Sequence, residues 1–216
     1  MIDNLNLITP LLNFTNVDDF YMLYIFKRKK DQTTDKSNHQ SVRTIKSYTI
    51  SSVDYLNDRY EEIKMLCEVF KARAYIHVQS QRHSDIGLEM ISTICDRIRS
   101  GNVNQMHVFD SVVGQIKTNE KRWIVDIDNK DELYDREMQE FINTNCRPVK
   151  MKILANIPTK NGHHLITERF DVTTFREKYP DVDIQKKNPT LLYYPDSLDL
   201  QTNDIVIPVS VHSTNI

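Results

Sequence analysis

The chain has 216 residues, of which 39% are hydrophobic and 27% are charged, and its formal net charge at pH 7 is −2. A chain of this length and composition can bury a hydrophobic core, which excludes an extended disordered protein and favours a single globular domain. The absence of a basic excess argues against an extended surface that binds nucleic acid non-specifically, but it is compatible with a local basic patch.

The three cysteines are far apart and form no CxxC or Cys/His pattern, so we expect no zinc site and a reducing compartment. No apolar run approaches the ~18 residues that a membrane span requires, and the segment Met1–Leu12 has no basic region. We therefore expect a cytoplasmic protein with no signal peptide and no contact with a membrane.

The first part of the chain predicts a β-hairpin after a lead-in over residues 1–18. The aromatic and β-branched run Phe20–Lys29 is typical of a buried strand, and Thr44–Ile50 is a second strand candidate. The polar residues 31–40 between them predict a long loop. The basic run Lys27–Lys30 lies at the hairpin tip, where we expect either a solvated turn or a clamp on nucleic-acid phosphates.

Helices dominate the segment that follows the hairpin. We expect a helix over residues 51–70, a strand over 72–79, a second helix over 85–100 and a short helix over 104–117. Serines precede both longer helices, so we expect Ser51 or Ser52 to cap the first and Ser84 to cap the second. Gly101 is a suitable residue for the C-terminal end of the second helix.

Strands and helices alternate irregularly over the rest of the chain. The expected strands are Trp123–Asp128, Met151–Asn156, His164–Glu168, Pro180–Gln185, Leu191–Tyr194 and Ile205–Val211, and the expected helices cover 130–143 and 171–179. We expect Trp123 in the core, Leu133 on the inner face of its helix, and Pro180–Gln185 paired with Leu191–Tyr194. The pattern predicts an α+β fold with mixed or antiparallel sheets flanked by helices.

Two acids end the strand Trp123–Asp128. Residues two apart on a strand project from the same face, so Asp126 and Asp128 are expected side by side. Adjacent carboxylates repel unless a cation lies between them, and Mg²⁺ is often held by one or two carboxylates together with substrate phosphates. The segment Pro158–Ile166 then provides a glycine turn and a histidine that can contact a nucleotide. An isolated Asp-x-Asp is common, but the two segments together predict a divalent-metal nucleotidyl-transfer site.

These residues resemble the archaeo-eukaryotic primase superfamily, which includes the primase-polymerases. The first motif of that family, a strand ending in Asp-x-Asp or Asp-x-Glu, is similar to Trp123–Asp128. The second motif, a small residue-x-His at the start of a strand, is similar to Gly162-His163-His164. Of the two histidines, we expect His164 in the site and His163 facing solvent.

The third motif of the family is one more acid on a strand. The segment Asp181–Asn188, followed by Leu191–Tyr194, resembles this motif in eukaryotic-type primase-polymerases. Either Asp181 or Asp183 can serve as the third acid. The resemblance covers residues 126–194, and the earlier part of the chain fits the family's N-terminal module in outline.

The resemblance implies an RRM-like catalytic core, with an N-terminal module over residues 1–118 and the catalytic module over 119–216. It implies two-metal phosphoryl transfer with Mg²⁺ or Mn²⁺, in which a dNTP or NTP is added on a single-stranded DNA template during replication. A separate helicase or another replication protein is the implied partner. The implied catalytic and metal-binding residues are Asp126, Asp128 and Asp181 or Asp183, and the candidate nucleotide contacts are His164, Lys160, Arg169 and Arg82.

Two alternatives use the same residues. The chain can be a catalytically inactive, primase-like protein that binds nucleic acid or a replisome component. It can also be a metal-dependent nuclease, because phosphodiester hydrolysis uses similar carboxylates. The glycine-poor composition resembles that of phage and mobile-element proteins, which would place the chain in the host cytoplasm.

Overall fold

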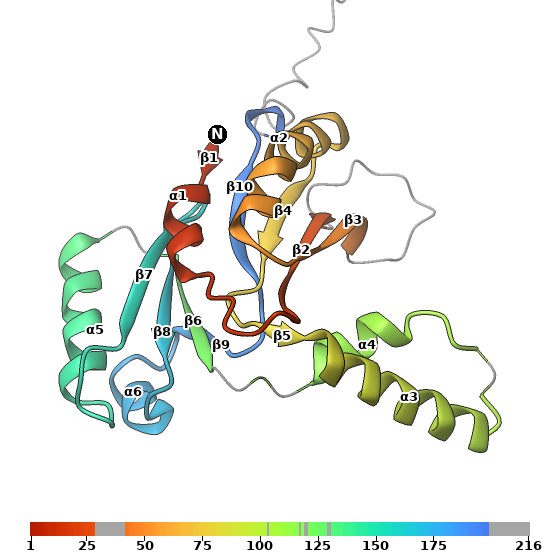
Figure 1. Ribbon diagram of the computed structural model, residues 1–216. Helices are drawn as coiled ribbons and strands as arrows, with labels where there is room; N and C mark the ends of the chain where they lie inside the picture. Colours follow the sequence, from red (N-terminus) through yellow and green to blue (C-terminus); the bar gives the residue numbers. More distant parts are fainter. Residues whose placement is uncertain (29–41, 103, 117, 119–120, 129–130, 199–216) are drawn as a thin grey trace, which may run out of the picture.

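The computed structural model describes residues 1–28, 42–102, 104–116, 118, 121–128 and 131–198 (Figure 1). In this part of the chain, two antiparallel sheets and six α-helices form a mixed α+β structure, which confirms the expected fold class. The loop expected over 31–40 and the strand expected at Ile205–Val211 lie outside the described residues. No helix within the described ranges is both long and apolar enough to cross a membrane.

The larger sheet has the strand order β1-β10-β4-β2-β3, and β5 pairs with β2. Its strands are β1 (Ile2–Asp3), β2 (Asp19–Arg28), β3 (Val42–Ile50), β4 (Arg73–Ile76), β5 (Gln81–Arg82) and β10 (Thr190–Tyr194). Antiparallel pairing of β2 with β3 confirms the expected hairpin. The lead-in also contributes the short helix α1 (Leu5–Ile8) and a 3-10 turn, Thr9–Leu11.

Three helices belong to the larger sheet's half of the chain: α2 (Val53–Phe70), α3 (His83–Arg99) and α4 (Val108–Gln115). Ser52 caps α2 as expected, because its side chain accepts a hydrogen bond from the Tyr55 amide at 3.0 Å. The expected Ser84 cap is wrong: α3 begins at His83, two residues before the expected start, and the Asp18 carboxylate accepts hydrogen bonds from both the amide and the hydroxyl of Ser84. Gly101, at φ +79°, follows the end of α3.

The smaller sheet has the strand order β7-β8-β6-β9 and carries both helices of its half on one face (Figure 1). Its elements in chain order are β6 (Arg122–Ile127), α5 (Glu132–Thr144), β7 (Ile153–Pro158), β8 (His163–Glu168), α6 (Val172–Lys178) and β9 (Asp183–Gln185). The side chains of Asp131 and Asp171 cap α5 and α6. Leu133 was expected on the inner face of α5, but it is 66% exposed. It lies five residues before the buried Met138, so the two side chains point about 140° apart around the helix axis.

The expected pairing of Pro180–Gln185 with Leu191–Tyr194 is wrong. The second of these segments becomes β10, which pairs with β1 and β4, whereas β9 pairs with β6. All five residues of β10 are buried, so the strand needs a position inside a sheet that is covered on both faces. Although it falls in the range 119–216, β10 therefore belongs to the larger sheet.

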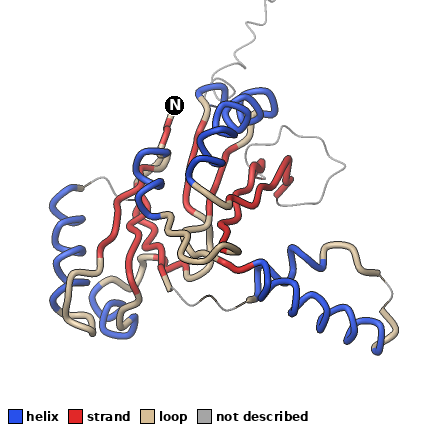
Figure 2. Tube along the Cα trace, in the orientation of Figure 1, coloured by secondary structure: helices blue, strands red, loops and turns tan. Residues whose placement is uncertain are grey.

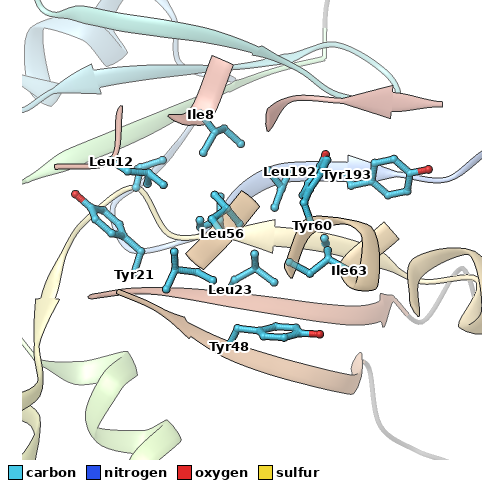
Figure 3. Packing of buried hydrophobic residues seen from close by; sticks show 14 of the residues in the cluster. Ile8, Leu12, Tyr21, Leu23, Tyr48, Leu56, Tyr60, Ile63, Leu192 and Tyr193 are labelled. Carbon is cyan, nitrogen blue, oxygen red and sulfur yellow. The ribbon is translucent and has the colours of Figure 1, made fainter. Parts of the chain in front are cut away.

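The strand β6 contributes to a core on each face of the smaller sheet, because its side chains alternate. Trp123, Val125 and Ile127 pack with residues of α5 and α6, which agrees with a core position for Trp123. Ile124 instead joins the core of the larger sheet. Side chains of α1 and α2 also pack in that core (Figure 3). At the end of β6, this second face becomes polar.

Buried Asn4 ties the two sheets together at that polar end. Its Nδ2 donates hydrogen bonds of 2.9 Å to the Pro158 carbonyl of the smaller sheet and to the Leu191 carbonyl of the larger sheet. The helices α3 and α4 lie apart from this contact, as a helical pair beside the sheets (Figure 2). The junction between the two sheets is thus the place where the polar end of β6 meets β10.

Candidate active site

Three neighbouring strands of the smaller sheet bring two acids and an imidazole together. Asp126 on β6 is the register partner of His164 on β8 and of Asp183 on β9. Directly paired residues of antiparallel strands project to the same face with their Cβ atoms about 5 Å apart. The His164 Nε2 atom lies 3.5 Å from Asp126 Oδ1. Asp128 follows the end of β6, two residues beyond Asp126.

A cavity of about 240 Å³ opens between these acids and the larger sheet. Its acidic lining residues, Asp126 and Asp128, come from the smaller sheet's half of the chain. The cationic lining residues are Arg28 at the end of β2, Arg73 at the start of β4 and Lys160 in the turn between β7 and β8. The cavity therefore offers opposite charges from different elements.

The acids create an excess of negative charge on their side of the cavity. Burial raises the pKa of Asp126, and the nearby carboxylates of Asp128 and Asp183 raise it further, while Arg28 lowers it. A divalent cation would relieve this repulsion, and an all-oxygen donor set of carboxylates suits Mg²⁺ or Mn²⁺. The donor chemistry therefore fits such ions, although no group of three His, Cys, Asp or Glu side chains in the described residues already has a metal-ligating arrangement.

The side-chain amide of Gln185 bridges two of the carboxylates by hydrogen bonds. Gln185 Nε2 donates to Asp126 Oδ2 at 3.2 Å and to Asp183 Oδ2 at 3.0 Å. Asn188 Nδ2 in turn donates to Gln185 Oε1 at 3.0 Å, which orients the amide. Both carboxylates are therefore bridged by the last residue of β9, which Asn188 of the connection to β10 holds in place.

His164 is a neutral hydrogen-bonding group at pH 7. Burial, together with a smaller effect of the neighbouring His163, lowers its pKa to about 4, against an opposing effect of Asp128. Its Nδ1 atom lies 2.9 Å from the Oγ1 atom of Thr190, a fully buried residue of β10. When the Thr190 hydroxyl donates to Nδ1, the imidazole proton is on Nε2, the nitrogen nearest Asp126.

The turn between β7 and β8 packs directly against the end of β6. A Cβ atom on Gly162 would lie 1.9 Å from the Ile127 carbonyl oxygen and 2.9 Å from Asp128 Cα, so this close approach requires glycine. The turn is closed by a 2.8 Å hydrogen bond from the Thr159 amide to the Gly162 carbonyl. This packing places Lys160, whose Nζ atom donates to the Tyr194 hydroxyl at 2.8 Å, on the cavity wall.

Three residues expected in the site lie elsewhere. Asp181 precedes β9 in a turn and raises the pKa of Tyr134 on α5, which places its charge toward the helix-covered face. Arg82 is paired with Asp18 at 3.2 Å next to the start of α3. Arg169 follows the opposite end of β8 from His164 and lines two other cavities.

His163 also differs from its expected solvent-facing position. It is 9% exposed, and its Nε2 atom lies 3.4 Å from Asp135 Oδ2 on α5. Successive strand residues point to opposite faces, so placing His164 in the cavity turns His163 toward the helix layer. Of the two candidate acids Asp181 and Asp183, Asp183 is the one that pairs with Asp126.

Sequence reasoning did not assign four residues to the site: Arg28, Arg73 and Gln185, which line the cavity, and Thr190, which contacts His164. Arg28 belongs to the basic run that was considered as a phosphate clamp. Arg73 is 3% exposed, with its guanidinium carbon 4.7 Å from the centre of the Tyr194 ring. A charged residue in an otherwise apolar central strand was a usable signal, whereas nothing near Thr190 in the sequence indicated its contact with His164.

A basic cavity of about 430 Å³ lies at the other end of β6. Its lining includes four cations, Lys121, Arg169, Lys186 and Lys187, and none of the described acids. Lys186 Nζ lies 5.0 Å above the ring of Trp123, which also lines the cavity. Despite the slightly negative net charge, the chain thus concentrates cations on one surface.

Comparison of the chain with protein-family models, with curated proteins and with solved structures gave no match. The interpretation of the cavity accordingly starts from the residues and their geometry.

Proposed function

We propose that this chain is a primase-polymerase-like nucleotidyltransferase that adds nucleotides to a strand on a single-stranded DNA template. The observation that carries the proposal is the alignment of Asp126, His164 and Asp183 on three adjacent strands, beside a cavity with cationic residues. A nucleoside triphosphate with its divalent ions presents both signs of charge. Carboxylates together with Arg28 and Lys160 are complementary to such a substrate.

The topology of the smaller sheet supports the same proposal. Its element order β-α-β-β-α-β and strand order β7-β8-β6-β9 correspond to the split βαβ arrangement of ferredoxin-like folds. A four-stranded sheet of this kind is what an RRM-like core would require. The acids and His164 lie on the face that α5 and α6 leave uncovered.

Each residue of the site has a role in this proposal. Asp126, Asp128 and Asp183 would hold Mg²⁺ or Mn²⁺, ions that supply charge neutralisation at the triphosphate and activation of the attacking hydroxyl. His164, neutral and oriented by Thr190, donates a hydrogen bond from Nε2 to a phosphate oxygen. Arg28 and Lys160 would add charge-assisted hydrogen bonds to the phosphates.

The basic cavity supports a nucleic-acid partner. Lys121, Arg169 and Lys186 lie beyond the opposite end of β6, about 10–17 Å from Asp126 at the rise of a β-strand. Cations at this spacing can contact phosphates of a template whose reacting end lies at the acids, and such contacts carry no sequence preference. Arg169 is thereby reassigned from the triphosphate to the template.

Primer extension on a single-stranded template tests the proposal. With Mn²⁺ or Mg²⁺ and dNTPs or NTPs, the wild-type chain should extend the primer. Asp126→Asn and Asp183→Asn should each lower the rate at least ~100-fold, because losing about 3 kcal/mol of charge stabilisation has that effect. Asp181→Asn is the matched control, since this acid lies near Tyr134 of α5 and does not pair with Asp126, and it should extend like wild type. Equal extension by wild type and a folded Asp126→Asn variant would overturn the mechanism.

One specific observation favours a second function, nucleic-acid binding without catalysis: the basic cavity is separate from the carboxylates. Isothermal titration with Mn²⁺ and a nucleotide distinguishes the two functions. A protein that binds oligonucleotides but shows no binding of the nucleotide at millimolar concentration is a binding subunit. Degradation of DNA without added nucleotides would instead identify the nuclease alternative.

A further inference from the structure

Helix α3 carries an apolar stripe that nothing in the described chain covers. Its inner face, with Ile86, packs with α4 in one core cluster. On a different side, Leu88, Ile91 and Ile98 are 70%, 63% and 57% exposed, and Cys95 is exposed between them. Soluble proteins rarely expose several large apolar side chains in one row, and such rows mark sites of association.

The spacing of the stripe is that of a helix that pairs with another helix. From Leu88 to Ile91, Cys95 and Ile98, the intervals are three, four and three residues, which is the pattern of a coiled-coil seam. The stripe is also self-complementary when a second copy of α3 runs antiparallel to it. Leu88 then faces Ile98 of the second copy, and Ile91 faces Cys95, around a two-fold axis at Thr93.

The charges beside the stripe fit the same two-fold pairing. Asp85 in the first turn of α3 and Arg99 in its last turn lie within about 40° of each other around the helix, so they flank the stripe on one side. An antiparallel partner brings Asp85 of one copy within about 3 Å, along the axis, of Arg99 of the other. The contact occurs twice by symmetry, whereas within one copy Arg99 has an exposed ion pair with Asp96 at 3.4 Å.

The position of α3 leaves room for such a partner. The α3–α4 pair extends to the side of both sheets, away from α5 and α6 (Figure 1). An isologous contact through one helix uses the same surface on both copies and closes after two subunits.

We propose that two copies of this chain associate through an antiparallel α3–α3 contact, centred on Thr93 and flanked by two Asp85–Arg99 pairs. The inference goes beyond the proposed function and does not rest on it, because the contact uses neither the acids nor the basic cavity. A second copy is the favoured occupant because both the apolar spacing and the charges complement themselves.

Sedimentation velocity of the full chain tests the contact. Over concentrations from about 1 to 200 µM, the wild type should shift from monomer to dimer. Ile91→Glu should weaken the dimer at least ~10-fold by placing two carboxylates near the axis. Leu133→Glu is the matched control, because Leu133 is equally exposed on α5 and should leave the dimer unchanged. A chain that stays monomeric throughout, or an Ile91→Glu variant that dimerises like wild type, overturns the proposal.

A charge exchange tests the orientation of the helices. Asp85→Arg alone and Arg99→Asp alone should each weaken the dimer, because each places like charges opposite one another. The double variant should recover most of the lost affinity, with helix content checked by circular dichroism. Two single variants whose effects simply add in the double variant would rule out the antiparallel pairing.

Cross-linking at Cys95 gives an independent readout. Cys67 and Cys146 are buried, so a bis-maleimide should react at Cys95. The two Cys95 residues of an antiparallel pair would lie about 10–12 Å apart, from four residues of axial offset and an 8–10 Å helix separation. A spacer of about 10 Å should yield covalent dimers with wild type, none with Cys95→Ser, and markedly fewer with Ile91→Glu. If removal of residues 199–216 instead accelerates maleimide reaction at Cys95 in a monomer, the chain's own tail covers the stripe and the proposal fails.

Discussion

Substitution of Gly162 by alanine is the most direct test of how the turn between β7 and β8 supports the site. The added Cβ would lie 1.9 Å from the Ile127 carbonyl oxygen and 2.9 Å from Asp128 Cα. Neither contact involves the flexible end of a side chain, so relief requires the backbone of the turn or of β6 to move. The atom nearest to the new methyl group belongs to the strand that carries Asp126.

The size of the effect follows from that distance. Real Cβ contacts are essentially never below 3.0 Å, so the two backbones must separate by about 1.1 Å. Overpacking of this kind costs about 1–3 kcal/mol, which lowers the melting temperature by roughly 2–12 °C for a chain of this size. A displacement of about 1 Å at Asp128 and Lys160 should also reduce a positioned phosphoryl transfer by ~100-fold.

Thermal unfolding and primer extension measure the two effects of Gly162→Ala. Two other glycines serve as controls, because a Cβ on Gly87 or on Gly114 meets no atom within 4 Å. Gly87→Ala, in the second turn of α3, should stabilise the protein by about 0.5–1 kcal/mol, owing to the better helix propensity of alanine. A Gly162→Ala protein with the wild-type melting temperature and extension rate would refute the proposed role of the close approach.

Three further substitutions test the structure. Burial lowers the pKa of His77 from 6.5 to about 4, so the unfolded state binds a proton first as pH falls. The free energy of unfolding should therefore fall by about 3 kcal/mol as the pH falls from 6.5 through 4. Urea titrations across this pH range should show a smaller decrease for His77→Gln than for wild type, and equal decreases would contradict the prediction. Thr190→Val should lower primer extension ~10-fold and allow His164 to change tautomer, visible in its ¹⁵N chemical shifts, while Thr190→Ser retains both. Asn4→Ala removes both inter-sheet hydrogen bonds and should cost about 1–3 kcal/mol in chemical denaturation; an unchanged midpoint would contradict that role.

Local signals in the sequence predicted the elements that depend on neighbouring residues. Ser52 caps the helix that follows it, since a cap needs partners two or three residues away. The alternation along β6 likewise places Trp123 with the helices and Asp126 on the opposite face. The Ser84 cap was wrong because its competitor, Asp18, lies 66 residues earlier in the chain.

Long-range partners explain what the sequence could not predict about the site. Asp181 and Asp183 have the same local pattern, and their difference arises from register: Asp183 pairs with Asp126, while Asp181 lies in a turn near Tyr134. The placement of β10 in the larger sheet was equally hidden, because its local sequence is compatible with either sheet. Arg73 contributes to the cavity through that same packing between sheets.

The segment from Asp183 to Thr190 joins the acids of the site to its histidine. Within eight residues it supplies an acid paired with Asp126, the amide of Gln185 that spans both carboxylates, and the hydroxyl that orients His164. The segment begins in the smaller sheet and ends in the larger one, so its two ends are held by different layers. The relative positions of acid and imidazole therefore depend on the packing of one sheet against the other. Loosening that junction should impair the site before either sheet unfolds, because the carboxylates stay on β6 and β9 while the partner of His164 leaves with β10.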